Sequence, residues 1–270
     1  MPFTLSHAAA ALPFRRLKPI WPALVIGTFA PDLQYFILLS DEDRSGHRFP
    51  DLLLFTLPVS LATLWLFEWI VKRPAIDLLP SGVQRRLQDK VEPLPFRGWR
   101  QFSRIVFWIA VGTLSHLIWD QFTHPYTRTA NYLPVLKTHV TPPFWHSVTV
   151  AGLLQDASTI LGFLAICLWC SAWYRRTAPA PKTRVPEFPP LTKLFVVSIV
   201  GLVALFAGGV LAWYTLSDYL GPVSRSKRVA VIFIAMTQLF CVEMLIYGLA
   251  ITLATRTQRV PAPEFDEKPR

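Results

Sequence analysis

The chain has 270 residues, of which 52% are hydrophobic and 16% charged, with a formal net charge of +10. This composition is too apolar for an ordinary soluble domain, and the apolar residues occur in long runs. The sequence therefore predicts an integral membrane protein. The positive charge does not indicate a nucleic-acid partner, because the basic residues lie in loops between apolar runs, where they orient the protein and meet anionic membrane lipid.

The N-terminal region predicts two unusual features. Residues 4–12 form an Ala-rich short helix with His7 in its first turn. Residues 20–39 are apolar and long enough to span a bilayer, but Ala30-Pro31 predicts a break between two helical pieces, with Asp32 in the first turn of the second. A single span would leave His7 on the opposite side from the other candidate ligands. We favour a re-entrant pair of pieces, because a buried Asp32 needs a partner.

The next part of the chain sets the predicted orientation. A polar loop, 40–50, carries His47 and leads into an uninterrupted apolar span at 51–71. Residues 72–104 form the most basic loop, whose segment 81–92 is expected to be a helix on the membrane surface. The positive-inside rule places this loop in the cytoplasm, so the following span, 103–122, runs outward.

That span ends in the most informative stretch of the sequence, GTLSHLIWDQFTHP. His116, Asp120 and His124 stand four residues apart, so on an α-helix each is turned only ~40° from the last and all three share one face. Pro125 disfavours helix at His124 and places the motif at the C-terminal end. Two imidazoles and a carboxylate at this spacing can coordinate one divalent metal.

The rest of the chain completes an all-α membrane bundle. The loop 125–146 contains His139 and His146, and further spans are expected at 147–174, 191–216 and 228–254. The fold class is therefore all-α, an integral membrane helical bundle of five or six transmembrane helices with a broken N-terminal segment. Four parts are expected: a metal-site helical unit (1–174), a Pro-rich cytoplasmic linker (175–190), a C-terminal helical hairpin (191–255) and a disordered tail (256–270).

Three motifs carry a resemblance to known families. MPFTLSHAAAALPFRRL, GTFAPDLQYF and SHLIWDQFTH resemble an uncharacterised family of bacterial multi-pass membrane proteins that opens with MPFTxSHAAA. More remotely, the order of His, Pro-Asp, loop His and His-x-x-x-Asp is similar to the membrane-bound metal-dependent hydrolases. It is also similar to the zinc-dependent phospholipase C and nuclease group, whose members are helical and cleave phosphoesters.

The resemblance implies a ligand set. By position, the ligands would be His7, Asp32, His47, His116, Asp120 and His124, with His139 or His146 as a later one. Two departures matter. Membrane hydrolases often have a second His five residues after the loop His, where this chain has Leu52. The His-x-x-x-Glu motif of the phospholipase group is also absent, because Pro143 and Val150 occupy the positions after His139 and His146. The residues thus support a site for one metal ion better than a cluster of three zinc ions like that of the phospholipase group.

Two functions remain open from the sequence. The first is a metal-dependent hydrolase, with zinc as the preferred ion and Asp32 or Asp120 as catalytic groups, acting on a phosphoester such as a lipid headgroup. The second is a non-enzymatic membrane protein with a structural or inactive metal site, or a transporter. In either case the expected location is the bacterial inner (cytoplasmic) membrane, with membrane lipid as partner and the site facing the extracytoplasmic side. The sequence does not define an oligomeric state.

Overall fold

The structure is a computed structural model, and it describes residues 4–17, 20–38, 51–96, 98–143, 147–181, 188–217 and 225–257. Five helices in these ranges are long and apolar enough to cross a membrane. They run over Leu52–Leu78, Gly98–Tyr132, Val150–Arg176, Pro190–Ser217 and Lys227–Ala254. The all-α fold predicted from the sequence is confirmed, and each of these helices coincides with a predicted span.

The first long helix is assembled from four consecutive segments, and the second range contains α7 and, after a non-helical stretch at 124–127, the short helix α8 Arg128–Tyr132. The bounds of the segments in the long helices are η3 Leu52–Thr56, α4 Leu57–Leu66, η4 Phe67–Val71, α5 Lys72–Leu78, α7 Gly98–Thr123, α9 Val150–Arg176, α10 Pro190–Ser217 and α11 Arg225–Thr257. Both η3 and η4 are π-helical, and each is followed closely by a proline, Pro58 or Pro74. Because proline has no N–H to complete the α-helical ladder, a wider turn beside it keeps the helix continuous.

Short helices make up the N-terminal region and the connections. They are η1 Thr4–Phe14, α1 Trp21–Phe29, η2 Ala30–Asp32, α2 Leu33–Leu38, α6 Ser81–Gln84, η5 Gln88–Lys90, α8 Arg128–Tyr132 and η6 Pro134–Lys137. The break predicted at Ala30-Pro31 is confirmed, because the 3-10 turn η2 separates α1 from α2. With nine residues, α1 is about 14 Å long, roughly half the hydrocarbon thickness.

Two connections differ from expectation. Segment 81–92 is not one surface helix: it forms α6 and η5, and Leu87 and Val91 turn back to pack against Ile76 and Leu79. The loop after α7 contains two short antiparallel strands, β1 His139–Val140 and β2 Val148–Thr149, in which His139 pairs with Thr149. Strands of two residues are too short to produce an alternating sequence pattern.

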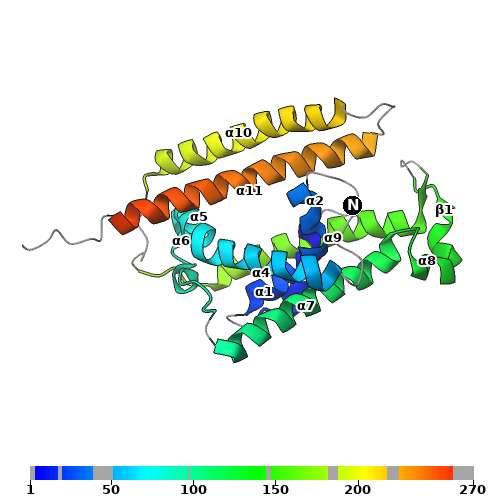
Figure 1. The fold of residues 1–270 in the computed structure, drawn as a ribbon, viewed down its shortest axis with the longest axis horizontal. Coiled ribbons are helices and arrows are strands. Elements are labelled where there is room, and N and C mark those ends of the chain that lie inside the picture. The colour runs from blue at the N-terminus through cyan, green and yellow to red at the C-terminus, as the bar shows by residue number, and fades with distance from the viewer. Residues whose placement is uncertain are drawn as a thin grey trace, which may run out of the picture.

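The core lies where α1 crosses α4 and α7 (Figure 1). Its buried apolar side chains are Ile20, Ala23, Ile26, Leu64, Leu94, Ile105 and Ile109. Two glycines allow α1 and α7 to touch through their backbones. A Cβ built on Gly27 would lie 2.3 Å from the carbonyl oxygen of Ile109, and one on Gly112 would lie 2.5 Å from that of Leu24. This close crossing brings the end of α1 against the second half of α7.

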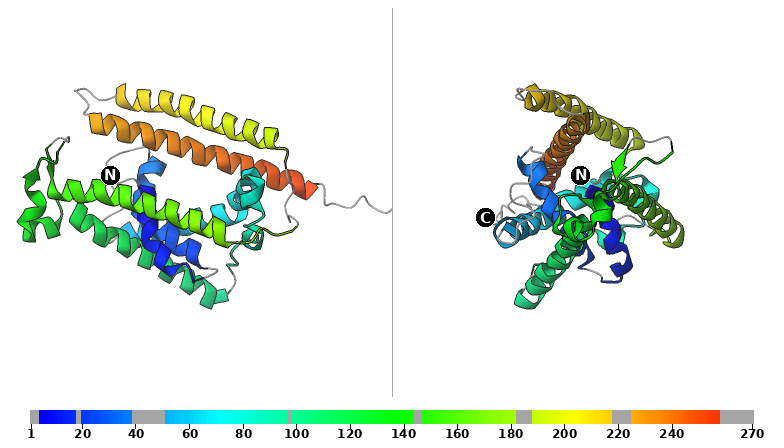
Figure 2. Two further views of the ribbon diagram at one scale, coloured as in Figure 1. Left: turned by 180° about the vertical axis from the view of Figure 1, so that it is seen from behind. Right: turned by 90° about the vertical axis from the view of Figure 1, so that its right-hand side faces the viewer.

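Helices α10 and α11 form an antiparallel hairpin beside the other elements (Figures 1 and 2). The hairpin contacts the rest of the protein through η4, α5 and α2, and two of its contacts are especially close. A Cβ on Gly248 of α11 would lie 2.5 Å from the carbonyl oxygen of Ile70. At the start of α10, the buried Lys193 donates from Nζ to Leu79 O and to Gln84 Oε1, both at 2.8 Å.

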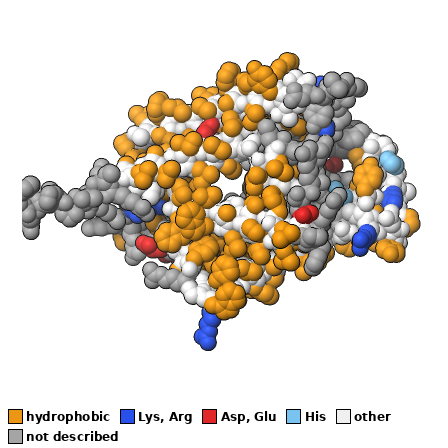
Figure 3. All heavy atoms as spheres, in the orientation of Figure 1, with side chains coloured by type: hydrophobic (Ala, Val, Ile, Leu, Met, Phe, Trp, Pro, Cys, Tyr) orange, Lys and Arg blue, Asp and Glu red, His pale blue; other side chains and the backbone are white. Residues whose placement is uncertain are grey.

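The surface reflects the apolar sequence. Hydrophobic side chains cover most of the face shown in Figure 3, over the long helices, whereas Lys, Arg and His side chains gather at the end formed by α8 and β1. Exposed large side chains such as Phe206, Trp213 and Leu161 lie on helices of membrane-spanning length. Exposed apolar side chains on such helices are suited to contact lipid chains.

Candidate metal centre

Three metal-ligating side chains from distant parts of the sequence meet inside the bundle. His7 comes from η1, and His116 and Asp120 come from the buried face of α7. One ligand atom of each lies within 4.8 Å of the others, and all three residues are buried. The imidazole rings of His7 and His116 stack with centroids 4.1 Å apart. The structure therefore brings the N-terminal helix against the face of α7 that carries His116 and Asp120.

A main-chain oxygen orients His116. Its Nδ1 donates to the carbonyl oxygen of Thr28, 2.8 Å away, near the end of α1. Pro31, three residues further on, has no N–H with which to bond that carbonyl. Because a carbonyl oxygen only accepts, Nδ1 carries the hydrogen and Nε2 of the neutral ring has a lone pair. The break in the N-terminal segment thus fixes the tautomer of a candidate ligand.

Nε2 of His116 faces two carboxylates. Nε2 lies 3.2 Å from Asp120 Oδ2 and 3.6 Å from Asp32 Oδ1, and both acids are buried. The other oxygen of Asp120, Oδ1, lies 4.0 Å from Nε2 of His7. Electron-rich atoms gathered in this way require a positive charge among them, either an added proton on an imidazole or a metal ion.

The donor set fits a divalent metal. A tetrahedral site with bonds of about 2.1 Å has neighbouring ligand atoms roughly 3.4 Å apart. One ligand atom of each residue lies within 4.8 Å of the others, so small movements of the side chains bring the three atoms to that spacing. His7 Nε2, His116 Nε2 and Asp120 would hold the ion, and Asp32 lies within reach as a further ligand or a base. The buried cluster can therefore hold a metal, and its two imidazoles and one carboxylate are a usual zinc donor set.

His124 lies beside this cluster. Helix α7 ends at Thr123, so His124 follows directly, as its position before Pro125 predicts. Its Nδ1 is 3.8 Å from Asp120 Oδ1 and 3.3 Å from the main-chain oxygen of Asp120, and 35% of its side chain is exposed. His124 therefore lies next to Asp120 on the more exposed side of the cluster. The three ligand atoms that lie close to one another belong to His7, His116 and Asp120.

Of the three remaining predicted ligands, His139 alone lies among the residues that the structure describes. His139 is exposed in β1, where it pairs with Thr149, and it is not part of the buried cluster. His47 and His146 lie outside the described residues.

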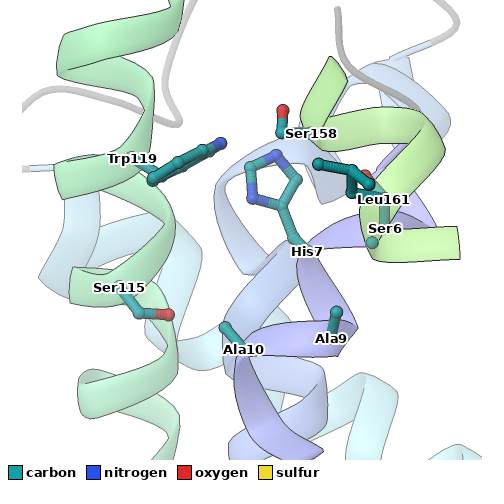
Figure 4. A pocket seen from close by; sticks show the side chains of 9 residues that line it. Ser6, His7, Ala9, Ala10, Ser115, Trp119, Ser158 and Leu161 are labelled. Atoms are coloured by element: carbon teal, nitrogen blue, oxygen red, sulfur yellow. The ribbon is translucent and has the colours of Figure 1, made fainter. Parts of the chain in front are cut away.

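A cavity of about 390 Å³ adjoins the cluster on the His7 side, between η1, α7 and α9 (Figure 4). The His7 ring stands between Trp119 of α7 and Leu161 of α9. Gly162 allows η1 to approach α9, since a Cβ there would lie 2.8 Å from the carbonyl oxygen of Ser6. The cavity and the candidate ligands thus share one wall.

Sequence reasoning did not identify two parts of this region. The first is the hydrogen-bond acceptor of His116, which is the main-chain carbonyl of Thr28. A pattern of side chains does not indicate which carbonyl lacks a helical N–H partner. The signal in the sequence is the proline three residues after Thr28. The cavity residues Ser115, Trp119 and Ser158 belong to membrane-length helices whose apolar periodicity does not distinguish a cavity wall from a lipid-facing surface.

Five membrane-length helices with a buried His–His–Asp cluster define a multi-pass helical membrane protein with a candidate metal centre. Residues 1–251 match the family described as "Domain of unknown function (DUF4184)", and the chain belongs to that family. Neither a curated protein nor a solved structure matches the chain.

Proposed function

We propose that this protein is a membrane-bound, metal-dependent hydrolase that cleaves a phosphoester such as that of a lipid headgroup. The observation that carries the proposal is the meeting of His7 with His116 and Asp120, within 4.8 Å, in a buried position. Buried ionisable groups in membrane-length helices are costly and usually serve a function. We further infer that the protein resides in the bacterial cytoplasmic membrane with the site toward the extracytoplasmic side, because the loop 72–104 is the most basic.

The candidate ligands and the nearby acid suit hydrolysis. A divalent metal held by His7, His116 and Asp120 would polarise a phosphoryl oxygen and acidify a water molecule. Thr28 keeps His116 in the tautomer that offers Nε2. Asp32, whose Oδ1 lies 3.6 Å from that nitrogen, is placed to accept a proton from water. The water oxygen bonds to phosphorus, the P–O ester bond breaks, and the departing oxygen receives the proton from Asp32.

Burial of the cluster also suits a second function, a structural metal site. His116 is only 1% exposed and both acids are buried, and structural sites use closed ligand sets. The two functions differ in whether a position remains for water. His124, with 35% of its side chain exposed, lies next to Asp120 and marks the less buried side of the cluster, and we therefore favour the hydrolase.

The test separates metal binding from turnover. Untagged protein in detergent is assayed for metal content and for hydrolysis of bis(p-nitrophenyl) phosphate and dibutanoyl phosphatidylglycerol. Wild-type protein is expected to hydrolyse at least one of them, and a chelator should abolish turnover. Asp32→Asn should retain metal and lose about 10²–10⁴-fold in rate. His116→Ala should lose both properties.

The matched control is Asp156→Asn, which changes an exposed carboxylate on α9 and should leave both properties unchanged. A wild-type protein that carries metal, loses thermal stability on chelation and hydrolyses neither compound would instead have a structural site, and the hydrolase proposal would be rejected.

A further inference from the structure

The cavity beside His7 has one apolar side that faces outward. Trp119 and Leu161 both line it, yet 43% of Trp119 and 63% of Leu161 are exposed. They belong to α7 and α9, two of the helices of membrane-spanning length. Exposed apolar side chains on such helices face lipid chains. The cavity therefore borders the hydrocarbon of the membrane on one side and the His7 imidazole on the other.

The inner lining provides hydrogen-bond acceptors. Ser115 donates its hydroxyl hydrogen to Gly112 O at 2.7 Å, and Ser158 donates to Gln155 O at 2.9 Å. Each hydroxyl hydrogen is thus used within its own helix, and each oxygen keeps lone pairs that can accept from a ligand. Such acceptors suit a group that carries hydroxyl donors, as a glycerol or sugar headgroup does.

The size of the cavity sets the part of a ligand that it can take. A volume of about 390 Å³ falls within the usual range of small-molecule sites, about 300–1,000 Å³. It accommodates a polar headgroup, whereas a pair of long acyl chains would extend beyond it. Chains leaving between Trp119 and Leu161 would pass directly into the bilayer.

We propose that this cavity is a lateral entry site for a hydroxyl-bearing phospholipid, whose headgroup lies against Ser115, Ser158 and His7 while its acyl chains stay in the membrane between α7 and α9. This inference rests on the proposed hydrolase function of the adjoining cluster. It adds the substrate class, a membrane-resident lipid phosphoester, and the direction of approach.

The experiment measures binding separately from turnover. Chelator-treated protein, which cannot hydrolyse the lipid, is incubated with dioleoyl phosphatidylglycerol in detergent, and the lipid retained through gel filtration is quantified by mass spectrometry. Ser158→Phe places a large ring in the cavity. The control, Ile160→Phe, adds the same ring two residues away on an exposed position of α9 that does not line the cavity. Thermal unfolding and metal content verify that both variants fold.

The expected result is about one retained lipid per wild-type or Ile160→Phe protein and at least a tenfold loss in Ser158→Phe. Equal retention in all three proteins overturns the entry site. Should Ser158→Phe fail to fold, Ser158→Leu takes its place.

Turnover by the metal-loaded proteins then tests the two proposals separately. Ser158→Phe should lose hydrolysis of dioleoyl phosphatidylglycerol in nanodiscs at least tenfold, because the ring fills the place of the headgroup, whereas Ile160→Phe should keep the wild-type rate. Lipid retention that depends on Ser158, in a protein whose wild-type form hydrolyses neither the long-chain nor the dibutanoyl lipid, supports the binding site and rejects the hydrolase. Hydrolysis of the long-chain lipid at the wild-type rate by Ser158→Phe rejects the entry site and leaves the hydrolase standing.

Discussion

At the scale of single residues, the site depends on which histidines reach Asp120. Spacing on one helix was enough to predict His116, Asp120 and His124 as neighbours, and the structure places all three together at the end of α7. His7 lies far away in sequence, and only the resemblance of motifs and the helix break suggested it. Its ring stacks on His116 at 4.1 Å. Spacing cannot report such a contact because it depends on how separate elements pack.

These positions predict a graded loss of metal in single His→Asn variants. His7→Asn removes an imidazole from the closest group and should lower zinc affinity by at least ~100-fold. His124→Asn removes a neighbour of Asp120 and should lower it by about tenfold. His139→Asn, in exposed β1, should have no effect. Metal analysis by mass spectrometry of untagged protein, with competition by a chelator, measures all three. A loss in His139→Asn as large as that in His7→Asn would contradict the assignment.

At the scale of elements, the contact between α1 and α7 positions the site. Sequence periodicity and the Ala30-Pro31 break predicted both helical pieces and the span, but not their crossing. That crossing depends on Gly27 and Gly112, which lie far apart in the chain and have no side chain to mark a contact. A glycine in a predicted helix has several explanations, and its partner becomes visible only in three dimensions.

Replacing a glycine by alanine should have opposite effects on stability at two positions, Gly209 and Gly112. Alanine favours a helix over glycine by about 1 kcal/mol, so Gly209→Ala in α10, where a Cβ meets nothing within 4 Å, should be neutral or stabilising. Gly112→Ala should cost about 1–3 kcal/mol of stability, because its Cβ would lie 2.5 Å from Leu24 O. It should also weaken metal binding by moving Thr28 away from His116. Thermal unfolding in detergent and metal content test this; equal stability of the two variants would show that the helices do not touch here.

At the scale of the whole molecule, the five long helices were predictable because a membrane demands long apolar runs, which dominate the sequence signal. The arrangement of these helices could not be predicted, because the side of a helix that faces lipid and the side that faces protein are both apolar and similar in composition. The same uniformity explains why the position of the hairpin beside the other helices had no sequence signature. Two of its close contacts are made by one cation, Lys193, and one glycine, Gly248.

Orientation in the membrane gives a prediction at this scale. The basic loop 72–104 should face the cytoplasm and the segment after α7 the outside. In a background where Cys167, Cys170 and Cys241 are replaced, Lys137→Cys should react with a membrane-impermeant maleimide on intact cells, and Lys90→Cys should react only after lysis. Both positions lie in polar connections outside the long helices. The reverse pattern would place the metal centre on the cytoplasmic side.

The contact between η1 and α9 has a consequence for biosynthesis. Of the helices described, η1 is made before the others, and it packs through Ser6 against Gly162 of α9, which is made about 150 residues later. Contacts between such distant parts of a chain form late, because the intervening chain must first be made and ordered. His7 therefore has an incomplete set of neighbours until α9 has been inserted. If the cluster holds a metal, its capture is tied to a late step of assembly, because a nascent chain stopped before α9 lacks the helix against which η1 and His7 pack.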